Sequence, residues 1–300
     1  MNTMDIFTVK DAELVTSDGE VFVPSHTIGR GRYGTCFEYV SPLRSICVKR
    51  IPTDRAAGEL EAIEILSKVS PNARRGCVAA SVAGTERGFV YIAMPMMSGD
   101  IGKLDLPVAP TAALRIVMRL SAILERLWIN GLAYCDLKCT NVLLGPENSA
   151  VFGDLGSIVP TDGSTGLFSF PPRRSMNCNK DGVCVPRESD LVWGVTMILS
   201  SLLLGTRWTS DRFGAQSIRS RAGTNSLSVA FDRVSRELKA EASLLPPSCE
   251  TVILYGIAAW EEGDRGKKHT LRGFRHLIDA PLSLKRSAYL SGIQWPLKVS

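Results

Sequence analysis

Short runs of alternating apolar and polar positions fill the first third of the chain. Residues 1–24 alternate weakly and have strand character. Residues 37–40 and 45–49 are two apolar runs separated by a turn at 41–44, which predicts a strand, a turn and a strand. Another apolar run at 89–94 predicts a further strand. The N-terminal region is therefore expected to be rich in β-structure.

Longer segments with a helical period follow and begin to dominate after residue 97. Residues 59–69 place apolar side chains on one side of a helix. Residues 111–130 lie between Pro110 and Gly131, a start and a stop signal for a long helix. Residues 192–205 are apolar throughout but shorter than the ~20 residues of a membrane span, which favours a buried core helix. The change in pattern predicts two domains, 1–97 and 98–300.

Composition narrows the class of protein without identifying it. The 300 residues are 45% hydrophobic and 22% charged, with a formal net charge of +5. These values are typical of a folded soluble protein, and no basic run indicates nucleic acid binding. The 8 cysteines are scattered and lack the paired spacing of zinc sites. With no recognisable signal peptide, we expect reduced thiols in an intracellular protein without a membrane span.

The stretch 134–156 carries the clearest chemistry. Asp136 and Asn141 precede an apolar run, and Asp154 follows a second apolar run after a Gly-Pro-Glu-Asn turn. A hairpin would therefore bring carboxylates and an amide to one mouth. Such hard oxygen ligands suit magnesium, which usually shares them with phosphates.

A glycine-rich segment lies upstream of this stretch. Gly29, Gly31 and Gly34 form a GxGxxG pattern, which also occurs in dinucleotide-binding folds. A dinucleotide fold places a helix directly after the glycines, whereas here a strand, a turn and a strand follow. The order favours a flexible loop that covers phosphates.

Lys49 is placed at the end of the second predicted strand, after three apolar residues. A buried lysine needs a partner, because an unpaired buried charge is costly. An acid from the predicted helix 59–69 would supply one, and we select Glu61 over Glu59 and Glu64. A solvated lysine at a strand end is the alternative.

In this order, the motifs resemble those of the eukaryotic-type protein kinases over roughly residues 25–275. ICVK stands where the family has VAIK, YCDLKCTN where it has HRDLKxxN, and DLG where it has DFG. The resemblance implies an α+β fold with two lobes, a β-rich N-lobe and a mainly helical C-lobe. It also implies that Asp190 opens a central buried helix.

The resemblance also implies roles for individual residues. Asp136 would orient the substrate hydroxyl and accept its proton, and Lys138 would neutralise charge on the transferred phosphoryl group. Asn141 and Asp154 would hold Mg²⁺. ATP would lie against Ile28, Gly29, Gly31, Gly34, Cys36, Cys47, Lys49, Glu61, Met94 and Met96.

Several positions depart from the family pattern. Tyr134-Cys135 replaces His-Arg, and that arginine normally binds a phosphorylated activation loop. We therefore expect activity that does not depend on such phosphorylation, and loss of activity after phosphatase treatment would contradict this. Arg173 stands where the family has an acid, so the usual pairing with a later arginine, here Arg265, is replaced or lost.

The expected function is transfer of the ATP γ-phosphoryl group to serine or threonine hydroxyls of protein substrates, since Lys138 is typical of the serine/threonine branch. The drift of the motifs resembles herpesvirus-encoded kinases, which would imply the host nucleus or the virion. Two alternatives stay open: a pseudokinase that binds nucleotide as a scaffold, and a kinase-fold enzyme that acts on a small molecule.

Overall fold

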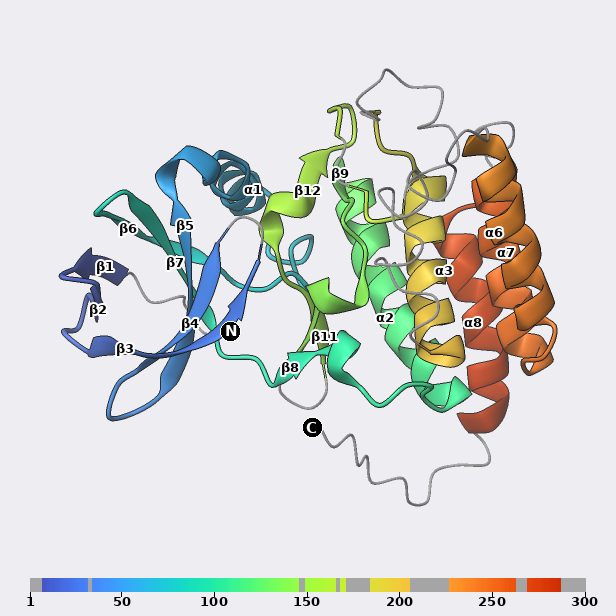
Figure 1. The fold of residues 1–300 in the computed structure, drawn as a ribbon, viewed down its shortest axis with the longest axis horizontal. Helices are drawn as coiled ribbons and strands as arrows, with labels where there is room; N and C mark the ends of the chain where they lie inside the picture. Colours follow the sequence, from blue (N-terminus) through green and yellow to red (C-terminus); the bar gives the residue numbers. More distant parts are fainter. Residues whose placement is uncertain are drawn as a thin grey trace. The chain divides into compact units, whose positions relative to one another are not determined.

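The computed structural model describes residues 7–31, 34–145, 149–165, 168–170, 184–205, 227–262 and 269–286. The chain is α+β, with strands concentrated in the N-terminal part and helices in the C-terminal part (Figure 1). It divides into two compact units. Unit 1 comprises Met1–Ser70, Gly76–Gly99 and Leu143–Ser157, and unit 2 comprises Pro71–Arg75, Asp100–Val142 and Ile158–Ser300.

Unit 1 is built on a seven-stranded sheet with the order β1-β2-β3-β4-β5-β7-β6 (Figure 1). Its strands are β1 (Phe7–Lys10), β2 (Glu13–Thr16), β3 (Val21–Arg30), β4 (Thr35–Val40), β5 (Ser45–Pro52), β6 (Ser81–Glu86) and β7 (Phe89–Pro95). Each neighbouring pair is antiparallel. The strands predicted at 37–40, 45–49 and 89–94 are confirmed, whereas β6 was not predicted.

Side chains alternate across β5, which separates two cores. Ile46 and Val48 join one cluster with Phe22 and Tyr91. Ile51 faces the other side and packs with Ala56, Val90 and Ile92. Helix α1 (Ala57–Lys68) covers this second side through Leu60 and Ile63. Lys49 has the same parity as Ile51, so its side chain lies on the face that α1 covers.

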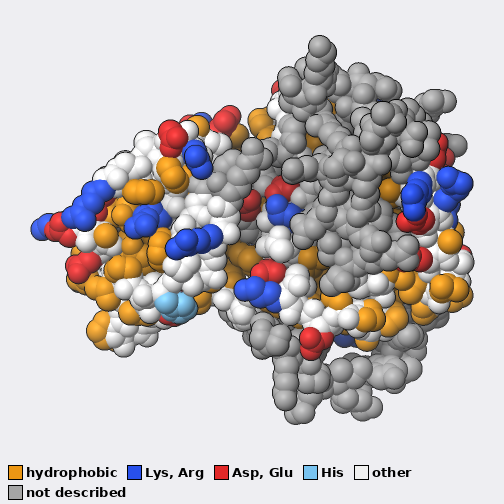
Figure 2. Space-filling view, viewed as in Figure 1, with side chains coloured by type: hydrophobic (Ala, Val, Ile, Leu, Met, Phe, Trp, Pro, Cys, Tyr) orange, Lys and Arg blue, Asp and Glu red, His pale blue; other side chains and the backbone are white. Residues whose placement is uncertain are grey.

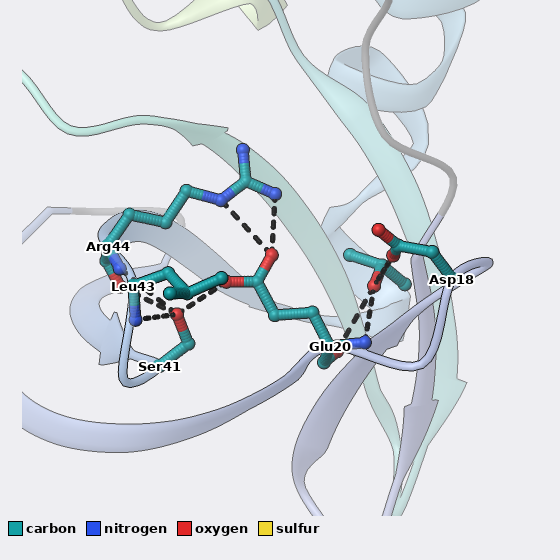
Figure 3. Close-up of polar contacts among 6 residues, drawn as sticks. Asp18, Glu20, Ser41, Leu43 and Arg44 are labelled. Carbon is teal, nitrogen blue, oxygen red and sulfur yellow. Dashed lines mark hydrogen bonds and ion pairs between the residues drawn. The ribbon is translucent and has the colours of Figure 1, made fainter.

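The turn between β4 and β5 is held by a polar cluster (Figure 3). Arg44 N–H donates to Ser41 Oγ over 3.1 Å, and Ser41 Oγ donates to Glu20 Oε1 over 2.6 Å. Arg44 also pairs with Glu20 Oε2 over 2.8 Å. The turn predicted at 41–44 is thus confirmed. Figure 2 shows acidic and basic side chains intermixed with hydrophobic ones on the N-terminal strands.

Long helices lie side by side in the described part of unit 2 (Figure 1). They are α2 (Pro110–Ile129), α3 (Glu188–Leu204), α6 (Leu227–Ala242), α7 (Pro247–Glu262) and α8 (Leu271–Arg286). Helix α3 contacts α2, α7 and α8 and is buried along almost its entire length. This agrees with the apolar character of its sequence, and the predicted buried helix at 192–205 is confirmed.

A glycine allows a close contact between α3 and α7 in unit 2. A Cβ added to Gly256 of α7 would lie 1.8 Å from Thr196 Oγ1 of α3. The rings of Trp193 and Trp260 stack nearby, with centroids 4.6 Å apart and planes inclined by 17°. Glycine at position 256 is therefore required by the approach of the two helices.

Shorter elements connect these parts. They are β8 (Gly99–Asp100), β9 (Leu132–Tyr134), β10 (Val142–Leu144), β11 (Ala150–Phe152), β12 (Ile158–Pro160) and the 3₁₀ turns η1 (Thr53–Arg55), η2 (Ile101–Lys103), η3 (Cys139–Asn141) and η5 (Leu155–Ser157). A three-stranded sheet has the order β11-β10-β8, and β12 pairs with β9. The two strands of the predicted hairpin are confirmed.

Some expectations fall on residues that the structure does not describe. The replacements expected at Arg173 and Arg265 lie outside the described residues, as does the C-terminal end of the chain. In the described part of the chain, no helix is long and apolar enough to cross a membrane.

Candidate functional site

The first cluster of candidate residues lies within unit 1 and is centred on Lys49. Its Nζ lies 2.6 Å from Glu59 Oε2 and 2.7 Å from Asp154 Oδ1. Lys49 comes from β5, Glu59 from the first turn of α1, and Asp154 from the segment between β11 and η5. Three segments that are distant in sequence thus place one ammonium group between two carboxylates.

The expected pairing of Lys49 with Glu61 is wrong, because Glu59 is the partner. Glu61 is exposed, whereas Glu59 is 6% exposed. The buried positions of α1 are Glu59, Ala62 and Leu66, spaced i, i+3 and i+7. Glu59 therefore lies on the same buried side of the helix as Ala62 and Leu66. The helical period would have identified Glu59 as the buried acid if acids had been considered for that side.

Lys49 also differs from its predicted place at a strand end. Strand β5 continues to Pro52, so Lys49 lies within the strand, directly opposite Cys36 on β4 and Ile92 on β7. The surrounding strands leave it 9% exposed. The alternative of a solvated lysine at a strand end is therefore wrong.

The electrostatics of this cluster favour a charged lysine. Burial alone would lower the pKa of Lys49, but the adjacent carboxylates of Glu59 and Asp154 outweigh it and hold the pKa above its usual range. Lys49 therefore stays protonated across the physiological pH range. Such a fixed cation on the face of a sheet is suited to binding an anion such as a phosphate.

The residues around Asp154 show why this acid is held so firmly. Its backbone φ is +44°, a left-handed conformation that is uncommon for a residue with a side chain. Ser157 N–H donates to its carbonyl over 3.1 Å. Gly156 N–H donates to the Glu59 carboxylate, and a Cβ at Gly156 would lie 3.1 Å from Glu59 Oε2. The Asp-Leu-Gly motif is thus bound to α1, and strain of this kind often marks a functional site.

The second cluster lies within unit 2 and is centred on Asp136. Lys138 Nζ lies 2.6 Å from Asp136 Oδ2. Asn141 Nδ2 donates to the same oxygen and to the Asp136 carbonyl, each over 2.9 Å. Only the amide nitrogen of Asn141 can donate to these two oxygens, so Asn141 Oδ1 makes neither contact. The structure brings together three of the four residues predicted around the catalytic loop and the metal.

Ser169 was not predicted as part of this cluster. Its hydroxyl donates a hydrogen bond to Asp136 Oδ1. The two residues are 33 positions apart, and nothing in the local sequence of Ser169 signals the contact. Asp136 therefore accepts from a lysine, an amide and a serine hydroxyl in this structure.

Tyr134 and Cys135, which replace the usual His-Arg pair, are both buried in unit 2. Tyr134 belongs to β9 and is opposite Ile158 of β12. Both side chains therefore belong to the buried interior of unit 2. A cysteine offers no cation for a phosphate, and activity that does not depend on activation-loop phosphorylation stays a prediction.

The remaining predicted nucleotide contacts all lie in unit 1. Ile28 and Gly29 lie in β3, and Gly31 and Gly34 lie between β3 and β4. Cys36 and Cys47 are half-buried on β4 and β5, as are Met94 in β7 and Met96 just after it. A Cβ at Gly34 would lie 2.6 Å from the carbonyl oxygen of Arg50. Glycine is therefore needed there for the loop to approach β5.

The two side chains predicted to hold Mg²⁺ belong to different units, and each offers an oxygen donor. Asp154 supplies a carboxylate that is 28% exposed, and Asn141 supplies the amide oxygen left over from its contacts with Asp136. Both are hard oxygen ligands of the kind that Mg²⁺ prefers. The described residues contain no group of three or more His, Cys, Asp or Glu side chains arranged for a metal.

Comparison of the chain with protein-family models gives no match, and comparison with curated protein sequences gives none either.

Proposed function

We propose that this chain is an ATP-dependent serine/threonine protein kinase with the two-lobed kinase fold. The observation that carries the proposal is Lys49 held by Glu59 and Asp154 on one face of a β-sheet. The ordered motifs around these residues are those of the kinase resemblance. Phosphoryl transfer relies mainly on positioning and charge stabilisation, and a fixed ammonium group beside a metal-binding carboxylate supplies both.

Each cluster has a distinct task in this proposal. Lys49 binds the α- and β-phosphates, and Glu59 keeps its side chain in place. Asn141 and Asp154 would hold Mg²⁺, which neutralises phosphate charge when bound. Asp136 orients the substrate hydroxyl and accepts its proton, and Lys138 offsets charge on the transferred group.

The contact between Ser169 and Asp136 supports the role assigned to Asp136. A serine hydroxyl donates to this carboxylate in the structure, which is the contact that a serine of a protein substrate would make. The same contact also gives some support to a second function, a nucleotide-binding scaffold with little turnover. In that case Ser169 would keep Asp136 occupied. A resemblance to herpesvirus-encoded kinases stays a prediction.

The test is incubation of the purified protein with labelled ATP, Mg²⁺ and casein. We expect the wild type to label casein, and K49M, D136N and D154N to lose the label. K68M is the matched control, since Lys68 is an exposed lysine on α1. Equal labelling in all variants would indicate a contaminating kinase and contradict the proposal. ATP binding without transfer would favour the scaffold function instead.

A further inference from the structure

Ser169 lies in a part of unit 2 that is anchored by its neighbours. The side chains of Phe168 and Phe170, on either side of it, are both buried, whereas Ser169 itself is half-buried. Shortly before it, Thr165 pairs with Cys184 through two backbone hydrogen bonds of 2.9 Å each. The position of the Ser169 hydroxyl is therefore set by the packing of the residues around it.

This hydroxyl contacts the carboxylate to which the base role is assigned. It donates to Asp136 Oδ1, whereas Lys138 and Asn141 contact Oδ2. Two donors on one oxygen orient the carboxylate, which presents its other oxygen to the serine. A general base must lie within hydrogen-bonding reach of the proton that it takes, and this contact meets that condition. The chain itself thus places an acceptor hydroxyl in front of the base.

We propose that Ser169 is a site of phosphorylation that the chain modifies itself, by intramolecular transfer from ATP. The inference rests on the proposed kinase function. Ser169 Oγ forms a bond with the γ-phosphorus, the bond from that phosphorus to the β–γ bridging oxygen breaks, and ADP leaves with the electron pair. The hydroxyl proton passes to Asp136 Oδ1. Because base and acceptor are already in contact within one chain, the step needs no encounter with a second chain.

Modification would change the contact between Ser169 and Asp136. A phosphoserine carries about 1.5–2 negative charges near neutral pH, and the carboxylate of Asp136 repels it. The contact is therefore lost once the phosphate is attached, and the carboxylate becomes available to another hydroxyl. Before modification, Ser169 competes with an external substrate for the same oxygen.

The test is self-labelling of the full chain. The protein is treated with a phosphatase, separated from it and incubated with labelled ATP and Mg²⁺, and peptide mass spectrometry locates the phosphate. We expect phosphate on Ser169 in the wild type and none in Lys49→Met. Ser169→Thr keeps a hydroxyl and should be modified at the same position. Ser164→Ala is the matched control, because Ser164 is an exposed serine shortly before Ser169, and it should leave the modification of Ser169 unchanged.

Dilution separates an intramolecular step from transfer between chains. The rate constant for modification of Ser169 should stay the same over a dilution of about tenfold. In a mixture with the wild type, the Lys49→Met chain should stay unmodified. A rate constant that falls in proportion to the dilution, or modification of the Lys49→Met chain, would overturn the proposal.

Casein in the same reaction distinguishes this proposal from the proposed function. Ser169→Ala should label casein several-fold faster than the phosphatase-treated wild type in the first minutes, because the competing hydroxyl is gone. Labelled casein with unmodified Ser169 would overturn self-modification and leave the kinase function standing. If neither is labelled, the kinase function fails and this proposal fails with it. Circular dichroism melting checks that each variant is folded.

Discussion

At the scale of single residues, the identity of the acid that pairs with Lys49 has the largest consequence. Glu59 and Glu61 are two positions apart on α1, yet the first is buried against Lys49 and the second is exposed. A helix turns by about 100° per residue, so two positions move a side chain to nearly the opposite face. The pair therefore offers a matched comparison on one helix.

We expect Glu59→Gln to reduce phosphoryl transfer at least about tenfold, a loss of roughly 1.4 kcal/mol of transition-state stabilisation or more. The physical reason is that Lys49 loses one of its two anionic partners, so its side chain is no longer held in place. Glu61→Gln should retain wild-type activity. The measurement is the initial rate of casein labelling, and equal rates in the two variants would contradict the assigned partner.

A second prediction at this scale concerns Glu125 on α2, which is buried and accepts hydrogen bonds from Arg272 and Arg275 on α8. Burial tends to raise the pKa of Glu125, but the two arginines outweigh it and lower the pKa overall. A lowered pKa means that the carboxylate stabilises the fold above the unfolded value of about 4.3 and that this contribution is lost as the pH falls through the folded pKa.

The free energy of unfolding should therefore fall less steeply between about pH 5 and pH 3 in Glu125→Gln than in the wild type. At neutral pH, this variant should lose about 1.5–3 kcal/mol of unfolding free energy, the usual range for hydrogen bonds to a charged group. Urea unfolding at several pH values measures both effects. Glu64→Gln is the control, because its pair with Lys68 is exposed and its loss should not change stability measurably. Parallel pH profiles for Glu125→Gln and the wild type would refute the assignment.

At the scale of elements, α3 and α7 pack so closely that a methyl group has no room. Gly256 faces Thr196, whereas Gly58, near the start of α1, has no atom within 4 Å of the position of an added Cβ. A Gly→Ala substitution therefore has opposite physical consequences on the two helices. At Gly256 it inserts volume into a packed core, and at Gly58 it only reduces the freedom of the unfolded chain.

Gly256→Ala should lower the free energy of unfolding by about 3 kcal/mol, at the upper end of the usual cost of overpacking. Gly58→Ala should raise it by about 0.5–1 kcal/mol, the typical gain in helix propensity. Chemical denaturation of both variants measures the difference. Similar stabilities for the two variants would show that α3 and α7 do not approach as closely as described.

At the scale of the whole molecule, the two units each have their own core, and the candidate residues are divided between them. Lys49, Glu59 and Asp154 belong to unit 1, and Asp136, Lys138 and Asn141 belong to unit 2. The proposed reaction needs both clusters, whereas nucleotide binding through Lys49 depends mainly on the first. Binding and transfer should therefore be separable by mutation.

Mg-ATP at about one hundred times its dissociation constant should stabilise the wild type by roughly 2.7 kcal/mol, or about 5 °C in melting temperature. Asp136→Asn should keep this shift but lose transfer, and Lys49→Met should lose both. Differential scanning fluorimetry with and without Mg-ATP measures the shift. A full shift in Lys49→Met would rule out Lys49 as a phosphate contact.

The sequence by itself determined most of the helices and strands, and it is the source of the proposed chemistry. A helical period of apolar residues located α1, the start and stop signals at Pro110 and Gly131 located α2, and continuous apolar runs located α3 and β7. The order of glycines, lysine and acids indicated the candidate site. The order of elements also argued against a dinucleotide-binding fold, because strands and not a helix follow the glycines.

Only the tertiary structure decided which side chains meet. The pairing of Lys49 with Glu59, and not with Glu61, depends on the rotation of α1 about its axis. That rotation is set by packing against Ile51 and Val90. The contact of Ser169 with Asp136 and that of Gly256 with Thr196 join segments distant in sequence. The local sequence pattern indicates which face of each segment is buried. It does not indicate which other segment packs against that face.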